Sequence, residues 1–157
     1  MRKMIAAVPV AALVFALATP AAAQSGHFIE RTVSCTDIGT QVECTGKVAG
    51  LGGTTFTIVV EADGIASVSC TNPGGNVAPG QNTSVTTEGS SGPMPTPKNG
   101  QYVFPSITTD DPEPLPPTPT CPNDQWTADV VDVSFTTATL SLYEDSTLSD
   151  QITVPVN

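Results

Sequence analysis

The sequence has 157 residues, a net charge of −10, and only five basic residues against fifteen acidic ones. Two of the basic residues are Arg2 and Lys3, so the chain from residue 24 onward has a net charge of −12. Nucleic acid and anionic membrane surfaces are excluded as default partners, because basic patches recognise both.

Residues 1–23 have the pattern of a secretory signal peptide. The two basic residues precede an apolar run over residues 4–18, and Ala21-Ala22-Ala23 supplies small residues before Gln24. The run is shorter than the roughly 20 residues that a membrane-spanning helix needs. We therefore expect a secreted, extracellular protein without membrane insertion, in which residues 24–157 form a single domain.

Apolar side chains recur at every second residue, which is the period of β-strands. The pattern predicts an all-β fold, an immunoglobulin-like β-sandwich of eight or nine short strands. The dipeptide Asp63-Gly64 predicts a tight hairpin turn between two strands. The expected strands are residues 28–36, 41–49, 54–62, 65–71, 82–88, 101–109, 126–135, 137–143 and 150–155.

A proline-rich stretch interrupts this pattern. Residues 93–122 contain ten prolines, and proline cannot donate to a sheet ladder. We predict an extended, polyproline-like excursion at about 110–122. A stiff connection between strands is favoured over a ligand for a proline-binding groove.

Four cysteines in an exported domain predict two disulfides, for which three connectivities are possible. A two-residue hairpin loop at Gly39-Thr40 would place Cys35 directly opposite Cys44, which leaves Cys70 to pair with Cys121. The same register places one set of side chains on the buried face: Val33, Cys35, Val42, Cys44 and Val48. The cysteines lack metal-ligand spacing, so a metal site or a reactive thiol is disfavoured.

The most distinctive loop is Asn72-Pro73-Gly74-Gly75-Asn76. Asn72, Gly74, Gly75 and Asn76, with Trp126, are candidates for a ligand-binding loop. The alternative is a fixed turn in which the Asn side chains bond their own backbone. Trp126 would then cover the Cys70–Cys121 bridge or close the end of the sandwich.

No catalytic residue, metal site or cofactor is assigned. The single histidine, His27, lies near the start of the mature chain, where it is expected to be exposed. A weak alternative is a calcium site formed by the carboxylates around the proline-rich stretch, because Ca²⁺ accepts oxygen ligands from loops. These carboxylates are Asp110, Asp111, Glu113 and Asp124. A second acidic group, formed by Glu144, Asp145 and Asp150, is expected to be solvated surface.

Three blocks together resemble a family of small secreted bacterial proteins of actinobacterial type, which has no assigned activity. They are Ser34-Cys35-Thr36-Asp37 through Cys44-Thr45-Gly46-Lys47, Cys70-Thr71-Asn72-Pro73-Gly74-Gly75-Asn76 with Ala78-Pro79-Gly80-Gln81-Asn82, and Cys121-Pro122-Asn123 with Trp126. The resemblance implies export and an all-β domain, and it carries over no binding or catalytic residue.

These features predict a non-catalytic extracellular binding or cell-envelope-associated module, whose partner is an unknown protein or glycan. One alternative is an inhibitor of secreted proteases that presents residues 92–97 as an exposed loop. Another is a glycan hydrolase that uses paired carboxylates.

Overall fold

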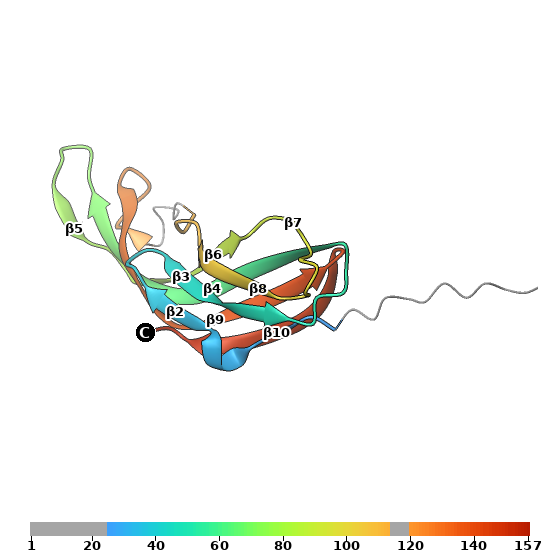
Figure 1. Cartoon of the computed structure of the whole chain (residues 1–157). Helices are drawn as coiled ribbons and strands as arrows, with labels where there is room; N and C mark the ends of the chain where they lie inside the picture. Colours follow the sequence, from blue (N-terminus) through green and yellow to red (C-terminus); the bar gives the residue numbers. More distant parts are fainter. Residues whose placement is uncertain (1–24, 114–119) are drawn as a thin grey trace, which may run out of the picture.

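The computed structural model describes residues 25–113 and 120–157, and strands dominate both stretches (Figure 1). They form two sheets, so the predicted all-β class is confirmed, and the arrangement is consistent with a sandwich. The narrower immunoglobulin-like expectation stays a prediction.

The smaller sheet contains β1 (His27–Phe28), β2 (Ser34–Asp37), β3 (Val42–Ala49) and β8 (Tyr102–Thr108). The larger sheet contains β4 (Thr55–Thr71), β5 (Val77–Pro79), β6 (Thr83–Ser90), β7 (Met94–Pro95), β9 (Thr127–Glu144) and β10 (Thr147–Pro155).

β3 organises the smaller sheet, since β1, β2 and β8 all pair antiparallel with it. β1 pairs with the end of β3, where His27 lies opposite Ala49. A short 3-10 helix, η1 (Glu30–Thr32), separates β1 from β2. The predicted strand 28–36 is therefore two shorter strands with a helical turn between them.

β4 and β9 organise the larger sheet, with 17 and 18 residues respectively. They pair antiparallel along almost their full length, and β10 continues the sheet beyond β9. β5, β6 and β7 also pair with β4. The carbonyl of Ile58 accepts a hydrogen bond from the Ser91 amide next to β6, whereas that of Thr55 accepts from the Asp145 amide next to β9. Because successive strand residues aim their backbone groups at opposite edges, even-numbered residues of β4 bond toward β6 and odd-numbered ones toward β9.

The prediction of a turn at Asp63-Gly64 is wrong, because β4 runs straight through both residues. Gly64 faces the core, and a Cβ atom there would lie 2.9 Å from Phe135 Cδ1. The pairing between β4 and β9 also shifts between Asp63 and Gly64, which leaves Thr136 as an extra residue. This glycine therefore permits close packing beside a β-bulge rather than a chain reversal. The predicted strands 54–62 and 65–71 are one strand, and so are 126–135 and 137–143.

Alternate residues of the two sheets fill the space between them. Every even-numbered residue of β4 is buried, whereas the odd-numbered ones are exposed or half-buried. The smaller sheet contributes the predicted inward face, of which Val33 is partly buried and the other four members are fully buried. The Phe28 and Phe104 rings pack edge to face, with 6.4 Å between their centroids. The period-two pattern thus predicted correctly the inward face of the smaller sheet.

Both preferred disulfides are present. Cys35 lies directly opposite Cys44 in the β2–β3 ladder, and the two are bonded with a Cα–Cα distance of 4.1 Å. Cys70 bonds to Cys121 with a Cα–Cα distance of 5.8 Å. All four cysteines are buried within the core. The hairpin register at Gly39-Thr40 therefore predicted the connectivity correctly.

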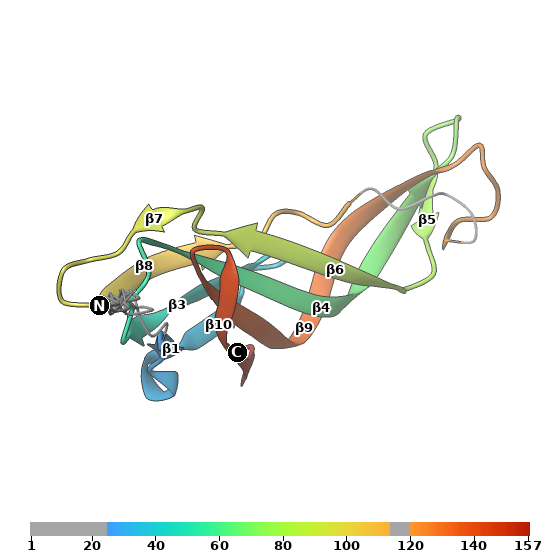
Figure 2. The ribbon, with the colours of Figure 1, turned by 90° about the vertical axis from the view of Figure 1, so that its right-hand side faces the viewer.

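One end of the larger sheet projects beyond the smaller sheet as an arm (Figures 1 and 2). The arm consists of residues 67–79 and 121–132, which include β5 and the adjoining ends of β4 and β9. The Cys70–Cys121 disulfide links its two segments. The loop 72–76 lies between β4 and β5 in this arm.

The proline-rich excursion begins and ends beside β6. The Asp110 amide donates to the carbonyl of Glu88, and the Gln81 amide donates to the carbonyl of Thr120. Residues 114–119, which hold most of the predicted polyproline run, lie outside the described residues.

We expect the two disulfides to contribute unequally to stability. By the chain-entropy relation, Cys70–Cys121 closes the longer loop and should contribute about 4 kcal/mol, whereas Cys35–Cys44 should contribute about 3 kcal/mol. Urea unfolding of the double variants Cys70→Ser/Cys121→Ser and Cys35→Ser/Cys44→Ser measures both. A larger loss from the Cys35–Cys44 pair would contradict this order.

Candidate functional site

The outer face of the larger sheet consists of the side chains that point away from the smaller sheet. On β4 these are the odd-numbered residues, and the strand register places their neighbours on β6 and β9 on the same face. The exposed carboxylates of this face come from all three strands: Glu61, Asp63, Glu88, Asp129 and Asp132. The strands of this sheet, all of which are described, contain no Lys, Arg or His. The outer face is therefore uniformly acidic.

Glu61 and Glu88 lie directly opposite each other in the β4–β6 ladder. Odd-numbered residues of β4 bond toward β9, so this is a non-hydrogen-bonded pair, in which the two side chains lie especially close. Like charges in such a pair destabilise a sheet. The fold tolerates this repulsion without a basic residue on the same sheet.

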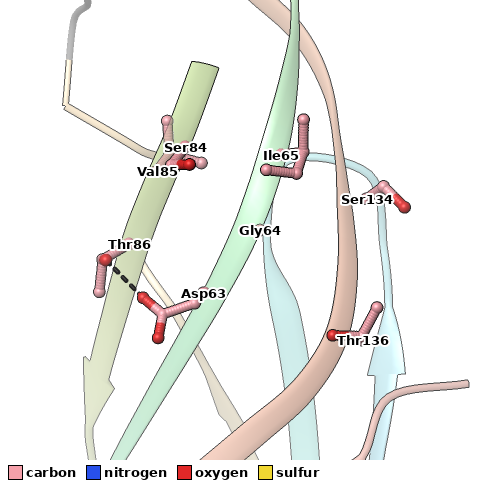
Figure 3. Close-up of a pocket in the computed structure, with 8 residues that line it drawn as sticks. All are labelled: Asp63, Gly64, Ile65, Ser84, Val85, Thr86, Ser134 and Thr136. Atoms are coloured by element: carbon pink, nitrogen blue, oxygen red, sulfur yellow. Dashed lines mark hydrogen bonds between the residues drawn. The ribbon is translucent and has the colours of Figure 1, made fainter. Parts of the chain in front are cut away.

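A groove of about 390 Å³ opens on the outer face at the β-bulge (Figure 3). Ile65 is 48% exposed in it, and the register places this side chain between Ser84 and Ser134. Its remaining lining comes from the same three strands: Asp63, Gly64, Val85, Thr86 and Thr136. The exposed Ile65 side chain is thus surrounded by hydroxyl groups and a carboxylate, and the second aliphatic residue of the lining, Val85, is nearly buried.

Asp63 is oriented within this groove by a neighbouring hydroxyl. Thr86 Oγ1 donates to Asp63 Oδ1 at 2.6 Å, as the dashed line in Figure 3 shows. The second carboxylate oxygen, Oδ2, points away from the Thr86 hydroxyl in Figure 3. The groove therefore combines apolar contact with a fixed acceptor, which suits a ligand that has a cationic or donor group beside an aliphatic one.

A second polar centre is buried where β9 turns into β10. The Glu144 side chain is fully buried, and its carboxylate accepts at least four hydrogen bonds. Oε2 accepts from the Gly26 amide at 2.9 Å and from the Ser149 hydroxyl at 2.6 Å. Oε1 accepts from the Gly52 and Gly53 amides at 2.6 and 3.1 Å. This carboxylate therefore ties three chain segments together.

The expectation that Glu144, Asp145 and Asp150 form solvated surface is wrong for Glu144. The other two also act as acceptors for backbone groups. Asp145 accepts from the Thr54 and Thr55 amides, and Asp150 accepts from the Phe28 amide at 2.8 Å. The composition of this segment could not reveal these hydrogen bonds, because the amide donors lie about 90 to 120 residues away from the carboxylates in the sequence.

Burial opposes ionisation of Glu144, but its hydrogen bonds prevail. The Ser149 hydroxyl and the amides of Gly52, Gly53 and Gly26 together hold the pKa of Glu144 below its ordinary value. Glu144 is thus an ionised structural group that is saturated by donors of the fold.

The loop 72–76 is closed by its own side chains and backbone. Asn72 Oδ1 accepts from the Gly74 and Asn76 amides, both at 2.9 Å, and Gly75 adopts a positive φ of 80°. The fixed-turn alternative is therefore confirmed for Asn72. Trp126 immediately precedes the Thr71–Thr127 pair and is half-buried against the core that contains Cys70 and Cys121. The candidate loop and Trp126 lie on the same arm; Asn72 Oδ1 is engaged within the loop, whereas Gly74, Gly75 and Asn76 are exposed.

The candidate calcium ligands lie on two separate segments. Asp111 Oδ1 accepts from the Thr40 hydroxyl at 2.6 Å, whereas Asp124 lies on the loop before β9. Across residues 25–113 and 120–157, no group of three His, Cys, Asp or Glu side chains is placed to hold a metal ion. Asp110 and Glu113, three residues apart in the sequence, are both exposed.

Two further residues bear on the alternative functions. His27 is exposed, as predicted, and its Nδ1 lies 3.1 Å from the Ser25 carbonyl. Residues 92–97 are not a free loop, because Met94 pairs with Phe56 as part of β7 and packs half-buried against the core.

No protein-family model matches this chain, and no curated protein matches it. In the part of the chain that the structure describes, none of the helices has the length and apolar character to cross a membrane.

Replacing Glu144 with Gln should cost about 3 kcal/mol of unfolding free energy at pH 7, because an amide offers one acceptor where the carboxylate offers two. Urea unfolding measures the loss. Glu30→Gln, on an exposed part of η1, is the control and should stay within about 0.5 kcal/mol of wild type. An equal effect of both changes would show that the Glu144 carboxylate does not hold the three segments.

The contribution of Glu144 should depend on pH in one direction. Its folded pKa lies below its ordinary value of 4.5, so the contribution is fully present above that value and is lost as the pH falls through the folded pKa. The stability difference between wild type and Glu144→Gln should therefore shrink as the pH is lowered below 4.5. Unfolding free energies measured at pH 7, 5, 4 and 3 check this; a difference that stays constant contradicts it.

Proposed function

We propose that this protein is a secreted, non-catalytic binding module whose binding surface is the outer face of the larger sheet. Its partner would be a cationic polypeptide. The observation that carries the proposal is the uniform acidity of this face, on strands that contain no basic residue, around a groove with a half-exposed Ile65. Charge of one sign around an exposed apolar side chain supports recognition of a partner of opposite charge.

Export is supported by the signal-like pattern of residues 1–23 and by the two disulfides, which persist in oxidising compartments. The resemblance to small secreted bacterial proteins agrees with it. We extend the proposal to an immunoglobulin-like architecture, for which two sheets linked by a buried core are the support.

Absence of catalysis is supported by the roles of the ionisable groups. Glu144, Asp145 and Asp150 all accept hydrogen bonds from the backbone of other segments, which is a structural task. A glycan partner has less support than a polypeptide, because the groove is lined by no aromatic ring on which a sugar could stack. Protease inhibition lacks support from residues 92–97, because Met94 is packed against the core.

The proposal is tested with a blocked heptapeptide in which lysine alternates with valine. Wild type should bind it, and binding should weaken as salt rises, because screening reduces the attraction between exposed charges. The triple variant Glu61→Gln/Glu88→Gln/Asp132→Asn should bind at least tenfold more weakly. A variant with the same change in charge on other segments, Glu30→Gln/Glu43→Gln/Glu113→Gln, should stay within threefold of wild type.

Isothermal titration gives each dissociation constant, and a glutamate–valine peptide and chitin oligomers are titrated alongside. Failure of wild type to bind the lysine peptide, or equal binding by the two triple variants, would overturn the proposal. Binding of the chitin oligomers alone would replace a polypeptide partner with a glycan.

A further inference from the structure

The groove on the outer face lies where the β4–β9 pairing is interrupted. The register passes from Asp63–Thr137 to Gly64–Phe135, so Thr136 has no partner on β4. On the other side of β4, the pairing with β6 continues past the same point without a shift. The hollow is therefore a local feature of an otherwise regular sheet, and bulges of this kind occur frequently next to binding sites.

Ile65 provides an apolar platform within this hollow. It is 48% exposed, and it is the only exposed apolar side chain on the outer face of β4. Its direct neighbours are two serines, Ser84 on β6 and Ser134 on β9, and both are exposed as well (Figure 3). Because these neighbours are small, an aliphatic chain can lie on Ile65 without displacing another side chain.

Asp63 provides a charged group at a fixed distance from this platform. It lies two residues before Ile65 on the same face of β4, so their Cα atoms are about 6.6 to 6.8 Å apart. The Thr86 hydroxyl holds its carboxylate toward β6 (Figure 3). Within the described part of the chain this is the only hydrogen bond of the Asp63 carboxylate, and no ion pair neutralises it.

This combination suits a ligand with an aliphatic stem that ends in a cation. A lysine side chain has a flexible four-carbon stem and a compact ammonium group. Its stem can pack on Ile65 while the ammonium group reaches Asp63, since lysine commonly buries its methylenes along apolar surface and keeps its charge near polar groups. The hydroxyl groups that line the groove offer acceptors for the remaining ammonium protons.

Arginine fits the same groove less well. A guanidinium group binds a carboxylate best as a fork, with one N–H group on each of the two oxygens. Asp63 Oδ1 already accepts the Thr86 hydroxyl, which competes with one arm of the fork. An ammonium group needs only a single carboxylate oxygen, so the geometry favours lysine.

We propose that this groove is a subsite for one lysine side chain of a basic polypeptide, with Ile65 as the platform for its stem and Asp63 as the acceptor of its ammonium group. This inference rests on the proposed function and names the residues that select the partner. The other carboxylates of the outer face supply attraction to basic residues in general.

The acceptor role is tested with Asp63→Asn and the same lysine–valine heptapeptide. Asparagine removes the charge but keeps an oxygen that can accept from Thr86. Isothermal titration should show at least tenfold weaker binding. The matched control Asp129→Asn makes the same change in charge on the outer face, at an exposed position toward the arm, and should stay within threefold of wild type.

The platform role is tested with Ile65→Thr, which keeps a β-branched residue in the strand but offers less apolar surface. This variant should bind the peptide at least fivefold more weakly. The control is Val103→Thr, at a 64% exposed position on the smaller sheet, and it should stay within twofold of wild type.

Changes in the peptide test the fit of the lysine side chain itself. Replacing every lysine with 2,4-diaminobutyric acid keeps the ammonium groups but removes two methylenes from each stem, and binding should weaken at least fivefold. Replacing every lysine with arginine should weaken it at least threefold. In the saturated lysine complex, nuclear Overhauser contacts should join the δ1 methyl group of Ile65 to the lysine side-chain methylenes.

Equal weakening by Asp63→Asn and Asp129→Asn, or the absence of contacts between Ile65 and the lysine methylenes, would overturn the subsite. Binding of the arginine peptide as tightly as the lysine peptide would overturn the assignment to lysine. If binding is nevertheless lost in the outer-face triple variant, which leaves Asp63 and Ile65 unchanged, the proposed function stands and only the subsite is wrong. If wild type binds no peptide, the proposed function itself fails.

Discussion

The whole structure depends on the continuous pairing of β4 with β9. Each strand is long enough to pass from the body of the molecule into the arm, and their shared alternation decides which residues are buried (Figure 2). Because side chains alternate between faces, a slip of one residue would exchange the core of β4 for its acidic face. Two register shifts, at Asp63/Gly64 and Ser67/Val68, bend this pairing locally. The first of them creates the groove beside Ile65.

The attachment of the N-terminal strand to the larger sheet relies on carboxylates instead of a continuous ladder. Glu144 and Asp150 accept hydrogen bonds from the amides of Gly26 and Phe28, just before and within β1. Asp145 does the same for the residues that lead into β4. Acidic residues thus have two different roles in this protein. Those around the β9–β10 turn satisfy backbone donors, whereas those on the outer face have no cation on their own sheet.

The sequence predicted the features that arise from local periodicity. The spacing around Gly39-Thr40 sets the β2–β3 register, and that register fixes Cys35 opposite Cys44. Alternation likewise predicted the buried face of β3. Gly64 misled the prediction, because a glycine required by the side chains of Phe135 and Val133 on the neighbouring strand β9 resembles a glycine required by a turn. The role of Glu144 was inaccessible for a similar reason, since its amide donors Gly26, Gly52 and Gly53 come from distant segments that only the tertiary fold brings together.

The groove was also invisible in the sequence, because it depends on which strands become neighbours. A sheet selected for stability alone would separate Glu61 from Glu88, because like charges directly opposite each other destabilise a sheet. This unfavourable pair lies on the same face as the groove of Ile65. Proteins depart from locally favourable choices chiefly where function requires it. A basic partner bound to this face would relieve the repulsion between the two carboxylates, so the charge pattern and the groove are explained by one binding surface.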